Sequence, residues 1–458
     1  MTTLIVANDL VGLGKVALTS SLPIMSSCQI EVLPLPTVLL SSHTGEFEHI
    51  YLRDLKEDMK GFCQQWEQLD FKVDGLVSGY FKSREELDLV AQLAEEKQIP
   101  LFVDPIMGDN GQLYQGFDKT YVEAMRNFCQ QADVIIPNMT EASLLTGSPY
   151  LERDNYDKAT IEKLLRDLGK LGPKKVFLTG VSLEEGKIGL AYFDKENEQT
   201  TYLMRPSYSE HFYGSGDILT AILSSGYFHH LDLLEVCNLA LNFMDRVLLS
   251  TMSSGRPVKY GLFYESHIGY LLMDLKNYWR KQMVNNKIRE LVELSLYAAL
   301  IIVSVQFIRI PFGPQFVHLG NALVVIAVLI FGSKKGALVA TVGLGLFDIL
   351  NGYAAEVWIT ILESLIVCYV LHLVFEKALK SNDKTSYIIL IGVIAAVTKI
   401  ILNFVKYTII NTAVASLPLK AAMLASVVKI GGTFGTSVVT IIAVPLLYPI
   451  FKRILKKD

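Results

Sequence analysis

Near residue 290 the chain changes character. Before that point charged and apolar residues are interspersed, whereas the last third is nearly uncharged and is divided into apolar stretches by short polar loops. The stretches lie at about 291–308, 316–331, 336–350, 357–375, 386–410 and 423–450. Several approach the roughly 20 residues that a helix needs to cross about 30 Å of hydrocarbon, although the third is short. We therefore expect residues 288–458 to form an all-α polytopic membrane domain of about six helices.

Basic residues are distributed unevenly among the segments that join these stretches. Thirteen lie on one side: Arg280, Lys281, Lys287, Arg289, Lys334, Lys335, Lys377, Lys380, Lys384, Lys452, Arg453, Lys456 and Lys457. The other side holds Arg309 and Lys420. Because positively charged loops stay inside, this asymmetry predicts six spans in a bacterial plasma membrane, in contact with lipid, with the N-terminal domain and the C-terminus cytoplasmic. Buried helices of a soluble core would give no reason for it.

Residues 1–265 have the composition of a soluble α/β protein. Helix-length polar segments such as 83–98 and 160–171 alternate with short apolar runs at 4–7, 75–78, 101–103, 134–136 and 176–179. Such runs are typical of buried parallel strands, so we expect a mostly parallel sheet with helices on both faces. Residues 266–287 are predicted to form a juxtamembrane connecting helix, with Tyr278 and Trp279 as candidate interfacial anchors.

Composition and cysteine spacing exclude several classes of protein. The formal net charge is −4, which gives no basic excess for nucleic acid, and we expect no such partner. The five cysteines form no C-x-x-C pair and no cluster at metal-ligand spacing. The N-terminus lacks the basic and apolar regions of a secretory signal, so the first domain is expected to remain in the cytosol.

The sharpest local motif is the glycine-rich run from His211 to Asp217, which leads directly into an apolar helical pattern. Gly214, Ser215 and Gly216 would leave backbone N–H groups free at a helix N-terminus, where they can hold a phosphoryl group during transfer. Asp217 follows at the position for a base that accepts a proton from a substrate hydroxyl. A structural turn capped by Asp217 is the alternative.

Acidic residues follow two of the predicted strands. Asp104 comes directly after the run 101–103, and Asn138 and Glu141 follow the run 134–136. The carboxyl ends of parallel strands share one edge of a sheet, and a carboxylate there can hold Mg²⁺ directly or through water. Together with the glycine turn, these residues predict one site.

These motifs resemble the ribokinase-like superfamily, and within it the pyridoxal kinases, over about residues 1–255. The matching residues are Leu35 to Thr37, Ser41 to Gly45, Ser78 to Tyr80, Asp104 to Asp109, Asn138 to Glu141 and Gly214 to Asp217. The resemblance implies ATP and Mg²⁺ as cofactors. The roles it implies are substrate binding for Thr44 and Tyr80, nucleotide binding for Asn138 and Thr179, metal and phosphate binding for Asp104 and Glu141, and base catalysis for Asp217.

The chain departs from that family at Asn8 and Asp9, near the end of the first predicted strand, where better-known pyridoxal kinases have a serine. Asp9 could pair with a cationic amine of the substrate, which would favour pyridoxamine or pyridoxine-like ligands over the aldehyde. It could equally cap a helix or turn. Nearby, Gly12, Gly14 and Lys15 lack the G-K-[ST] ending of a P-loop, so no Walker-type ATPase is expected.

Polar residues inside the apolar stretches are candidates for a ligand site, because ionisable groups in the bilayer are costly and usually face a cavity or a partner. They are Asn321, Asp348, Asn351, Glu356, Glu363, Lys399, Asn403 and Lys406, with Trp358 as an aromatic neighbour. Solvation of interfacial loops is the alternative for each of them.

The membrane region resembles the substrate-binding S components of energy-coupling-factor (ECF) vitamin importers. The matching features are the six-span size, Phe316 to Ala322, Phe331 to Ala337, and Gly343 to Gly352 with its internal Asp348. The resemblance implies a transmembrane coupling subunit and two ABC-type ATPases as partners on other chains. Its docking face would include Ser295 and Ala299, which depart from an Ala-x-x-x-Ala pattern.

Taken together, the sequence predicts a bifunctional protein for vitamin uptake and salvage. The membrane domain would import a pyridoxal-type vitamer (pyridoxamine, pyridoxine or pyridoxal), and the kinase domain would phosphorylate its hydroxymethyl group. One alternative is the same architecture for hydroxymethylpyrimidine. The others are a non-catalytic kinase-like sensor that gates transport, and a membrane-anchored kinase whose helices transport nothing.

Overall fold

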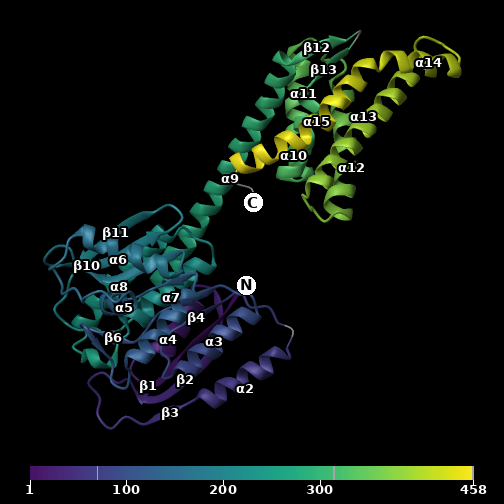
Figure 1. Cartoon of the computed structure of the whole chain (residues 1–458). Coiled ribbons are helices and arrows are strands. Elements are labelled where there is room, and N and C mark those ends of the chain that lie inside the picture. Colours follow the sequence, from purple (N-terminus) through teal and green to yellow (C-terminus); the bar gives the residue numbers. More distant parts are fainter. Residues whose placement is uncertain (70, 313–314, 456–458) are drawn as a thin grey trace. The chain divides into compact units, whose positions relative to one another are not determined.

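The computed structural model describes residues 1–69, 71–312 and 315–455, and the chain divides into two compact units, Met1–Arg280 and Lys281–Asp458. Figure 1 labels their helices and strands. Lys456 and Lys457, two of the basic residues assigned to the inner side, lie outside the described residues.

The first unit is built on one nine-stranded sheet with the order β11-β10-β9-β8-β5-β4-β1-β2-β3. The strands are β1 Thr2–Leu13, β2 Ile30–Ser42, β3 Leu52–Asp54, β4 Gly75–Ser78, β5 Leu101–Val103, β8 Val134–Ile135, β9 Lys175–Val181, β10 Lys187–Asp194 and β11 Gln199–Pro206. The pairings from β2 to β9 are parallel, while β3, β10 and β11 run antiparallel at the edges. The five predicted runs form the centre of the sheet.

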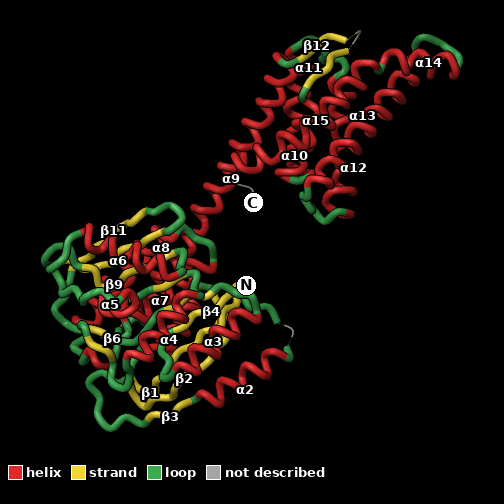
Figure 2. The backbone as a smooth tube through the Cα atoms, in the orientation of Figure 1, coloured by secondary structure: helices red, strands yellow, loops and turns green. Residues whose placement is uncertain are grey.

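Helices cover both faces of this sheet (Figure 2). They are α1 Ala17–Ser27, α2 Lys56–Glu67, α3 Arg84–Glu96, α4 Lys119–Gln130, α5 Met139–Thr146, α6 Lys158–Leu171, α7 Ser215–Phe228 and α8 Leu233–Ser253. Residues of α2 to α6 pack into one apolar core and residues of α1, α7 and α8 into another. This mixed, mostly parallel architecture confirms the expected ribokinase-like fold class. A small hairpin, β6 Gly108–Asp109 with β7 Gln112–Leu113, follows β5.

The segment after α8 forms two short 3₁₀ turns, η1 Val258–Tyr260 and η2 Glu265–His267, before α9 begins at Ile268 and continues to Phe307. Leu271 and Leu275 of α9 are buried in the core of the first unit. Trp279 packs edge-on against the ring of His229, and the hydroxyl of Tyr278 accepts a hydrogen bond from Asp232 N at 3.1 Å. Both aromatic residues are half-buried against the first unit, and their role as interfacial anchors stays a prediction.

The second unit is largely helical. After α9 it contains the hairpin β12 Arg309–Phe312 and β13 Gln315–His318, then α10 Gly320–Phe331, α11 Ser333–Leu350, α12 Val357–Leu371, the π-helical turn η3 His372–Ala378, α13 Thr385–Ala413, α14 Leu419–Lys429 and α15 Gly431–Ile454. Among the described residues, three helices are long and apolar enough to cross a membrane: Val357–Ala378, Thr385–Ala413 and Gly431–Ile454.

The hairpin and a helix break distinguish this unit from six uniform apolar stretches. The stretch predicted at 316–331 begins as a strand, and the stretch at 423–450 is broken between α14 and α15. The hairpin and the start of α15 pack closely against each other. A Cβ at Gly431 would collide with the ring of Phe312, and a Cβ at Gly435 would collide with Val317. The start of α15 therefore uses glycine to let the hairpin approach closely.

Candidate functional site

The glycine turn lies at the N-terminus of α7. Gly214 is the N-cap residue, with φ of +86°, and a Cβ at this position would collide with the carbonyl oxygen of Lys15, so glycine is required here. At Gly216, by contrast, a Cβ would meet nothing within 4 Å. The turn thus combines a fixed backbone with open space beside the first N–H groups of a helix, which is the arrangement that receives an anion.

Asp217 lies in the first turn of α7 and keeps part of its surface accessible. Asn8 Nδ2 lies 3.5 Å from its Oδ1, and the backbone N–H of Ala17 is a second donor that acts on the carboxylate. Burial raises the pKa of Asp217, while the Asn8 and Ala17 donors act to lower it. An accessible carboxylate held by two donors is a suitable base for a substrate hydroxyl.

Asp104 contacts helix α7, and Glu141 lies close enough to Asp104 for the two charges to interact. Asp104 Oδ2 accepts a 2.6 Å hydrogen bond from Thr220 Oγ1, one helical turn after Asp217 on α7. Glu141 accepts hydrogen bonds from the backbone N–H groups of Asn138 (2.8 Å) and Met107 (3.3 Å). The strand ends and the glycine turn therefore meet in one place.

The electrostatics of these carboxylates favour a cation. Burial and the charge of Asp217 raise the pKa of Asp104 to about 7, and burial and the charge of Asp104 raise the pKa of Glu141 well above its usual range. The described residues contain no group of three His, Cys, Asp or Glu side chains placed to hold a metal by themselves. The pair suits Mg²⁺, which keeps several waters and binds one or two carboxylates together with substrate phosphates.

The two predicted nucleotide-binding residues are neighbours. Asn138, which follows β8, forms an isolated parallel bridge with Thr179 of β9. Asn138 also caps α5 through its side chain, which accepts from Glu141 N at 2.9 Å, and it donates from Nδ2 to Gly108 O at 2.9 Å. Both residues thus lie at the carboxyl edge of the sheet, on the side of Glu141.

Asn8 links Asp217 to Asp9 and Tyr80. Asp9 is buried inside β1, so it caps neither a helix nor a turn, and that alternative is wrong. Asn8 Oδ1 accepts from the backbone N–H groups of both Asp9 (3.0 Å) and Tyr80 (2.8 Å). Thr44 is exposed after β2, and within the described parts of the chain no hydrogen bond joins it to Asp9 or Tyr80.

Two residues that organise the site were not predicted to do so. Asn8 joins Asp217 to the end of β4, and Thr220 joins Asp104 to α7. Neither residue stands out by its spacing from a motif, because each acts on a partner more than 70 residues away in the sequence. Polar residues placed one turn after a catalytic glycine turn, as Thr220 is, were the only sequence signal.

Substituting Asp9 with Asn is expected to stabilise the ligand-free protein at alkaline pH. Burial and the charge of Asp217 raise the pKa of Asp9 from 3.8 to about 8, so its contribution to stability is present below pH 4 and is lost as the pH rises through 8. At pH 8.5 we expect the free energy of unfolding of the variant to exceed that of the wild type by about 2 kcal/mol, which is roughly 5 °C in Tm. At pH 5 we expect the two proteins to be closer in stability.

Calorimetry of the full chain at both pH values checks this. The wild type is the matched reference, since His229, whose pKa burial lowers, titrates in both proteins. A variant that is equally destabilised at pH 5 and pH 8.5 would show that Asp9 makes a neutral structural contact instead.

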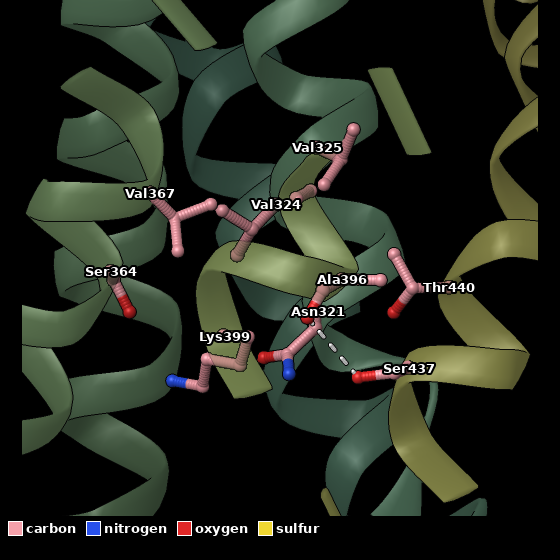
Figure 3. Close-up of a pocket in the computed structure, with 10 residues that line it drawn as sticks. Asn321, Val324, Val325, Ser364, Val367, Ala396, Lys399, Ser437 and Thr440 are labelled. Atoms are coloured by element: carbon pink, nitrogen blue, oxygen red, sulfur yellow. Dashed lines mark hydrogen bonds between the residues drawn. The ribbon is translucent and has the colours of Figure 1, made fainter. Parts of the chain in front are cut away.

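A second candidate site is a cavity of about 220 Å³ in the helical unit. Its lining is Val305, Phe316, His318, Asn321, Leu344, Phe347, Asp348, Tyr353, Glu356, Thr360, Glu363, Lys399, Asn403, Thr433 and Thr436. A smaller adjoining cavity of about 20 Å³ shares Asn321 and Lys399 with it. Figure 3 shows this smaller cavity, where Ser437 Oγ donates to Ala396 O at 3.4 Å.

An ion-pair cluster lies in the wall of the larger cavity. Lys399 Nζ is 2.6 Å from Glu363 Oε2, and Lys406 Nζ is 3.6 Å from Glu363 Oε1. All three side chains are largely buried, with exposed fractions of 15%, 11% and 18% for Lys399, Glu363 and Lys406. Charges placed in an apolar helical unit need partners of this kind, and they mark a functional site more often than not.

The structure brings together most of the polar residues proposed for the membrane domain. Asn321, Asp348, Glu356, Lys399 and Asn403 line the cavity. Asn351 and Trp358 do not: Asn351 Nδ2 donates to Phe347 O at 2.9 Å, and Trp358 is 63% exposed.

Some features of this cavity lay beyond sequence reasoning. His318 and Phe316 were not predicted as lining residues, because the hairpin that carries them was not foreseen. The proposed docking residues Ser295 and Ala299 are both exposed on α9.

Comparisons with known proteins divide the chain in the same way. A family model described as phosphomethylpyrimidine kinase matches residues 54–260, and one described as ECF-type riboflavin transporter, S component, matches residues 285–453. The crystal structure of pyridoxal kinase from Lactobacillus plantarum is 32% identical, with a TM-score of 0.56, over 60% of this chain and 97% of that chain. Pyridoxal kinase of Dictyostelium discoideum is 26% identical over 249 residues, which are 50% of this chain and 80% of that protein.

The fold and the site define the first unit as a ribokinase-like small-molecule kinase, joined to a helical membrane domain. More closely, the chain belongs to the family of pyridoxal and phosphomethylpyrimidine kinases over its first unit, and residues 285–453 are an S component domain of the ECF type.

Proposed function

We propose that this protein imports an unphosphorylated pyridoxal-type vitamer through its membrane domain and phosphorylates the hydroxymethyl group of that vitamer with its kinase domain. The observation that carries the enzymatic half is the meeting of the glycine turn and Asp217 with Asp104 and Glu141 through the Thr220 contact. A phosphate ester is charged and does not leak back through lipid, so phosphorylation would retain what the membrane domain delivers.

Each residue of the kinase site has a distinct task in this mechanism. Asp217 accepts the proton of the substrate hydroxyl while that oxygen attacks the γ-phosphorus of ATP. The free N–H groups of Gly214, Ser215 and Gly216 stabilise the charge that develops on the transferred phosphoryl group. Asp104 and Glu141 would hold Mg²⁺, directly or through water, and the ion neutralises phosphate charge when it is bound.

The remaining site residues bind the two substrates. Asn138 and Thr179 lie where the nucleotide is expected to be held, and Tyr80 and Thr44 are proposed to contact the pyridine ring. Asp9 is a buried acid, and no basic side chain among the described residues forms an ion pair with it. Its place beside Asn8 and Tyr80 favours a substrate that brings its own positive charge, such as the amine of pyridoxamine or a pyridinium nitrogen.

The membrane cavity suits the same class of ligand. Its volume of about 220 Å³ lies below the roughly 300–1,000 Å³ that drug-sized ligands occupy, which favours a single ring over a larger one. It is lined by the acids Asp348, Glu356 and Glu363 and by Lys399. Charges of both signs match a hydroxypyridine ring, which carries a pyridinium and a phenolate together near neutral pH.

Two other ligands are each favoured by one observation. The family model that matches the kinase half is described as phosphomethylpyrimidine kinase, which supports hydroxymethylpyrimidine as the substrate. The family model that matches the membrane half is described as an ECF-type riboflavin transporter, S component, which supports a flavin as the transported ligand. Riboflavin is larger and carries no net charge, so it makes less use of the Lys399 and Glu363 pair.

The membrane domain is proposed to work with partners on other chains. These are a transmembrane coupling subunit, which would dock on the α9 face that exposes Ser295 and Ala299, and two ABC-type ATPases. The positive-inside asymmetry supports a multi-pass arrangement with the kinase unit and the C-terminus on the cytoplasmic side.

Purified full-length protein in detergent, supplied with ATP and Mg²⁺, is expected to phosphorylate at least one of pyridoxal, pyridoxamine and pyridoxine. Hydroxymethylpyrimidine is expected to react more slowly, by about tenfold or more, because it offers no phenolate and a differently placed amine.

Mass spectrometry of the products measures this directly. Turnover of hydroxymethylpyrimidine alone would move the assignment to the pyrimidine branch. Folded protein that phosphorylates none of the four compounds would instead favour a non-catalytic sensor.

A further inference from the structure

The segment between α8 and α9 holds the turn that precedes α1. Lys15 Nζ makes a 2.5 Å ion pair with Glu265 in η2, and it also lies 5.3 Å from the ring centroids of both Phe263 and Tyr264. The side chain of Lys15 is only 17% exposed. A Cβ at Gly261 would collide with the backbone of Lys15, so the two segments are in direct contact. Three residues after Glu265, helix α9 begins.

The turn held in this way is the one that touches Asp217. The carbonyl oxygen of Lys15 lies against Gly214, and the backbone N–H of Ala17 acts on the Asp217 carboxylate and lowers its pKa. Ala17 has φ of +50°, a left-handed conformation that costs alanine about 1–2 kcal/mol. Such a conformation persists only where neighbouring contacts impose it, and the ion pair with Glu265 is a contact of that kind.

A second contact ties the same segment to the glycine turn. His43 Nδ1 accepts a hydrogen bond from Gly45 N at 3.1 Å, so its Nε2 carries the hydrogen and donates to Lys259 O at 2.5 Å. The His43 ring packs on Tyr213, with centroids 4.7 Å apart, and Tyr213 directly precedes Gly214. The segment 258–265 therefore supports the catalytic turn from two sides.

We infer that Glu265 is a positioning residue for phosphoryl transfer: through Lys15 it fixes the strained turn whose Ala17 N–H orients the catalytic base. This inference rests on the proposed role of Asp217. Glu265 touches neither substrate, so its effect is on the geometry of the base and not on binding. On this inference, the residues immediately before α9 contribute to catalysis by the kinase unit and do not serve only as a linker.

The test is a double-mutant cycle in the full-length protein with Lys15→Met, Glu265→Gln and both changes together. Each single change is expected to lower kcat by about 10- to 100-fold, because a small misplacement of a catalytic group costs that much. The KM values for ATP and vitamer are expected to change less than threefold. The double variant is expected to be no slower than the slower single variant, since both changes break one contact.

The pH profile separates positioning from general loss of structure. Loss of the Ala17 hydrogen bond removes a contact that lowers the pKa of Asp217, so the acidic limb of kcat is expected to move to higher pH. Asp217 also interacts electrostatically with four other titratable groups: Asp9, His43, Asp104 and Tyr114. None of these four residues is altered in the cycle.

Asp274→Asn is the matched control, because it breaks an ion pair between α9 and α8, with Arg246 at 3.5 Å, that does not reach the turn. This variant is expected to keep wild-type kcat. Wild-type kcat and an unmoved pH profile in Glu265→Gln would overturn the inference. Absence of turnover in the wild type itself would instead overturn the proposed function.

Discussion

Replacing Asp217 with Asn is expected to lower kcat for vitamer phosphorylation by about 100- to 10,000-fold, because a positioned general base contributes that much to a proton transfer. The amide keeps the size of the carboxylate and can still contact Asn8, but it cannot accept the hydroxyl proton. Binding of ATP and vitamer is expected to change little. Steady-state kinetics on the full-length protein, with thermal unfolding measured alongside, checks the prediction.

Asp232→Asn provides the control for this substitution. Asp232 caps α8 by accepting from Leu234 N and Glu235 N, away from the proposed site, and asparagine caps helices about as well as aspartate. Its kcat is therefore expected to match the wild type. If Asp217→Asn retained wild-type turnover while remaining folded, the base would have to be another group.

Replacing Lys399 with Met is expected to abolish vitamer uptake while leaving kinase turnover intact. The change leaves Glu363 buried with only the longer contact to Lys406, and removing one partner of a buried ion pair costs about 3–5 kcal/mol. If that cost destabilises the vitamer-bound form of the membrane domain, the affinity for the vitamer falls by at least about 100-fold. Uptake of labelled vitamer, in cells that supply an energy-coupling module and lack other uptake, measures the effect.

Two internal controls accompany the uptake experiment. Phosphorylation by the purified Lys399→Met variant reports that the first unit is intact, and Trp358→Phe changes an exposed residue outside the cavity lining. Uptake by the Trp358→Phe variant is expected to be normal. Normal uptake by Lys399→Met would show that the cavity around Glu363 is not the cargo site.

The sequence predicted the central strands better than the edges, for a physical reason. Strands β1, β4, β5, β8 and β9 are covered by helices on both faces, so their central residues are continuously apolar and easily recognised. Strand β2 contains Pro34 and Pro36, which argue against a strand, yet it pairs with β1 near the edge of the sheet. Strands β10 and β11 form the opposite antiparallel edge, where burial is less uniform.

The site was predictable only where its chemistry is local in sequence. Gly214 to Asp217 and Asn138 to Glu141 are short motifs whose spacing indicates helix N-termini. The contacts that assemble them are not local: Asn8 and Asp217 are 209 residues apart, and Asp104 and Thr220 are 116 apart. No pattern of spacing reports such pairs. The same is true of the ion pair between Lys15 and Glu265.

The membrane unit shows the limit of reasoning from hydropathy. Apolar length located the helices, but it could not show that residues 309–318 form a hairpin packed on Gly431 and Gly435. Polar residues within the stretches were better guides, because six of the eight polar candidates for a ligand site line one cavity. Buried charge is costly in a membrane, so its positions carry more information than the apolar background.

The most direct test is the identity of the small molecule that binds the membrane domain. Full-length protein carrying Asp217→Asn, purified from cells grown with all the candidate vitamins, would be extracted and its ligand identified by mass spectrometry. We predict an unphosphorylated pyridoxal-type vitamer, and we expect the amount recovered per protein to fall when Lys399→Met is added, because only the kinase site then retains it. Recovery of riboflavin, or of a pyrimidine, in its place would contradict a single vitamer serving both halves of the chain.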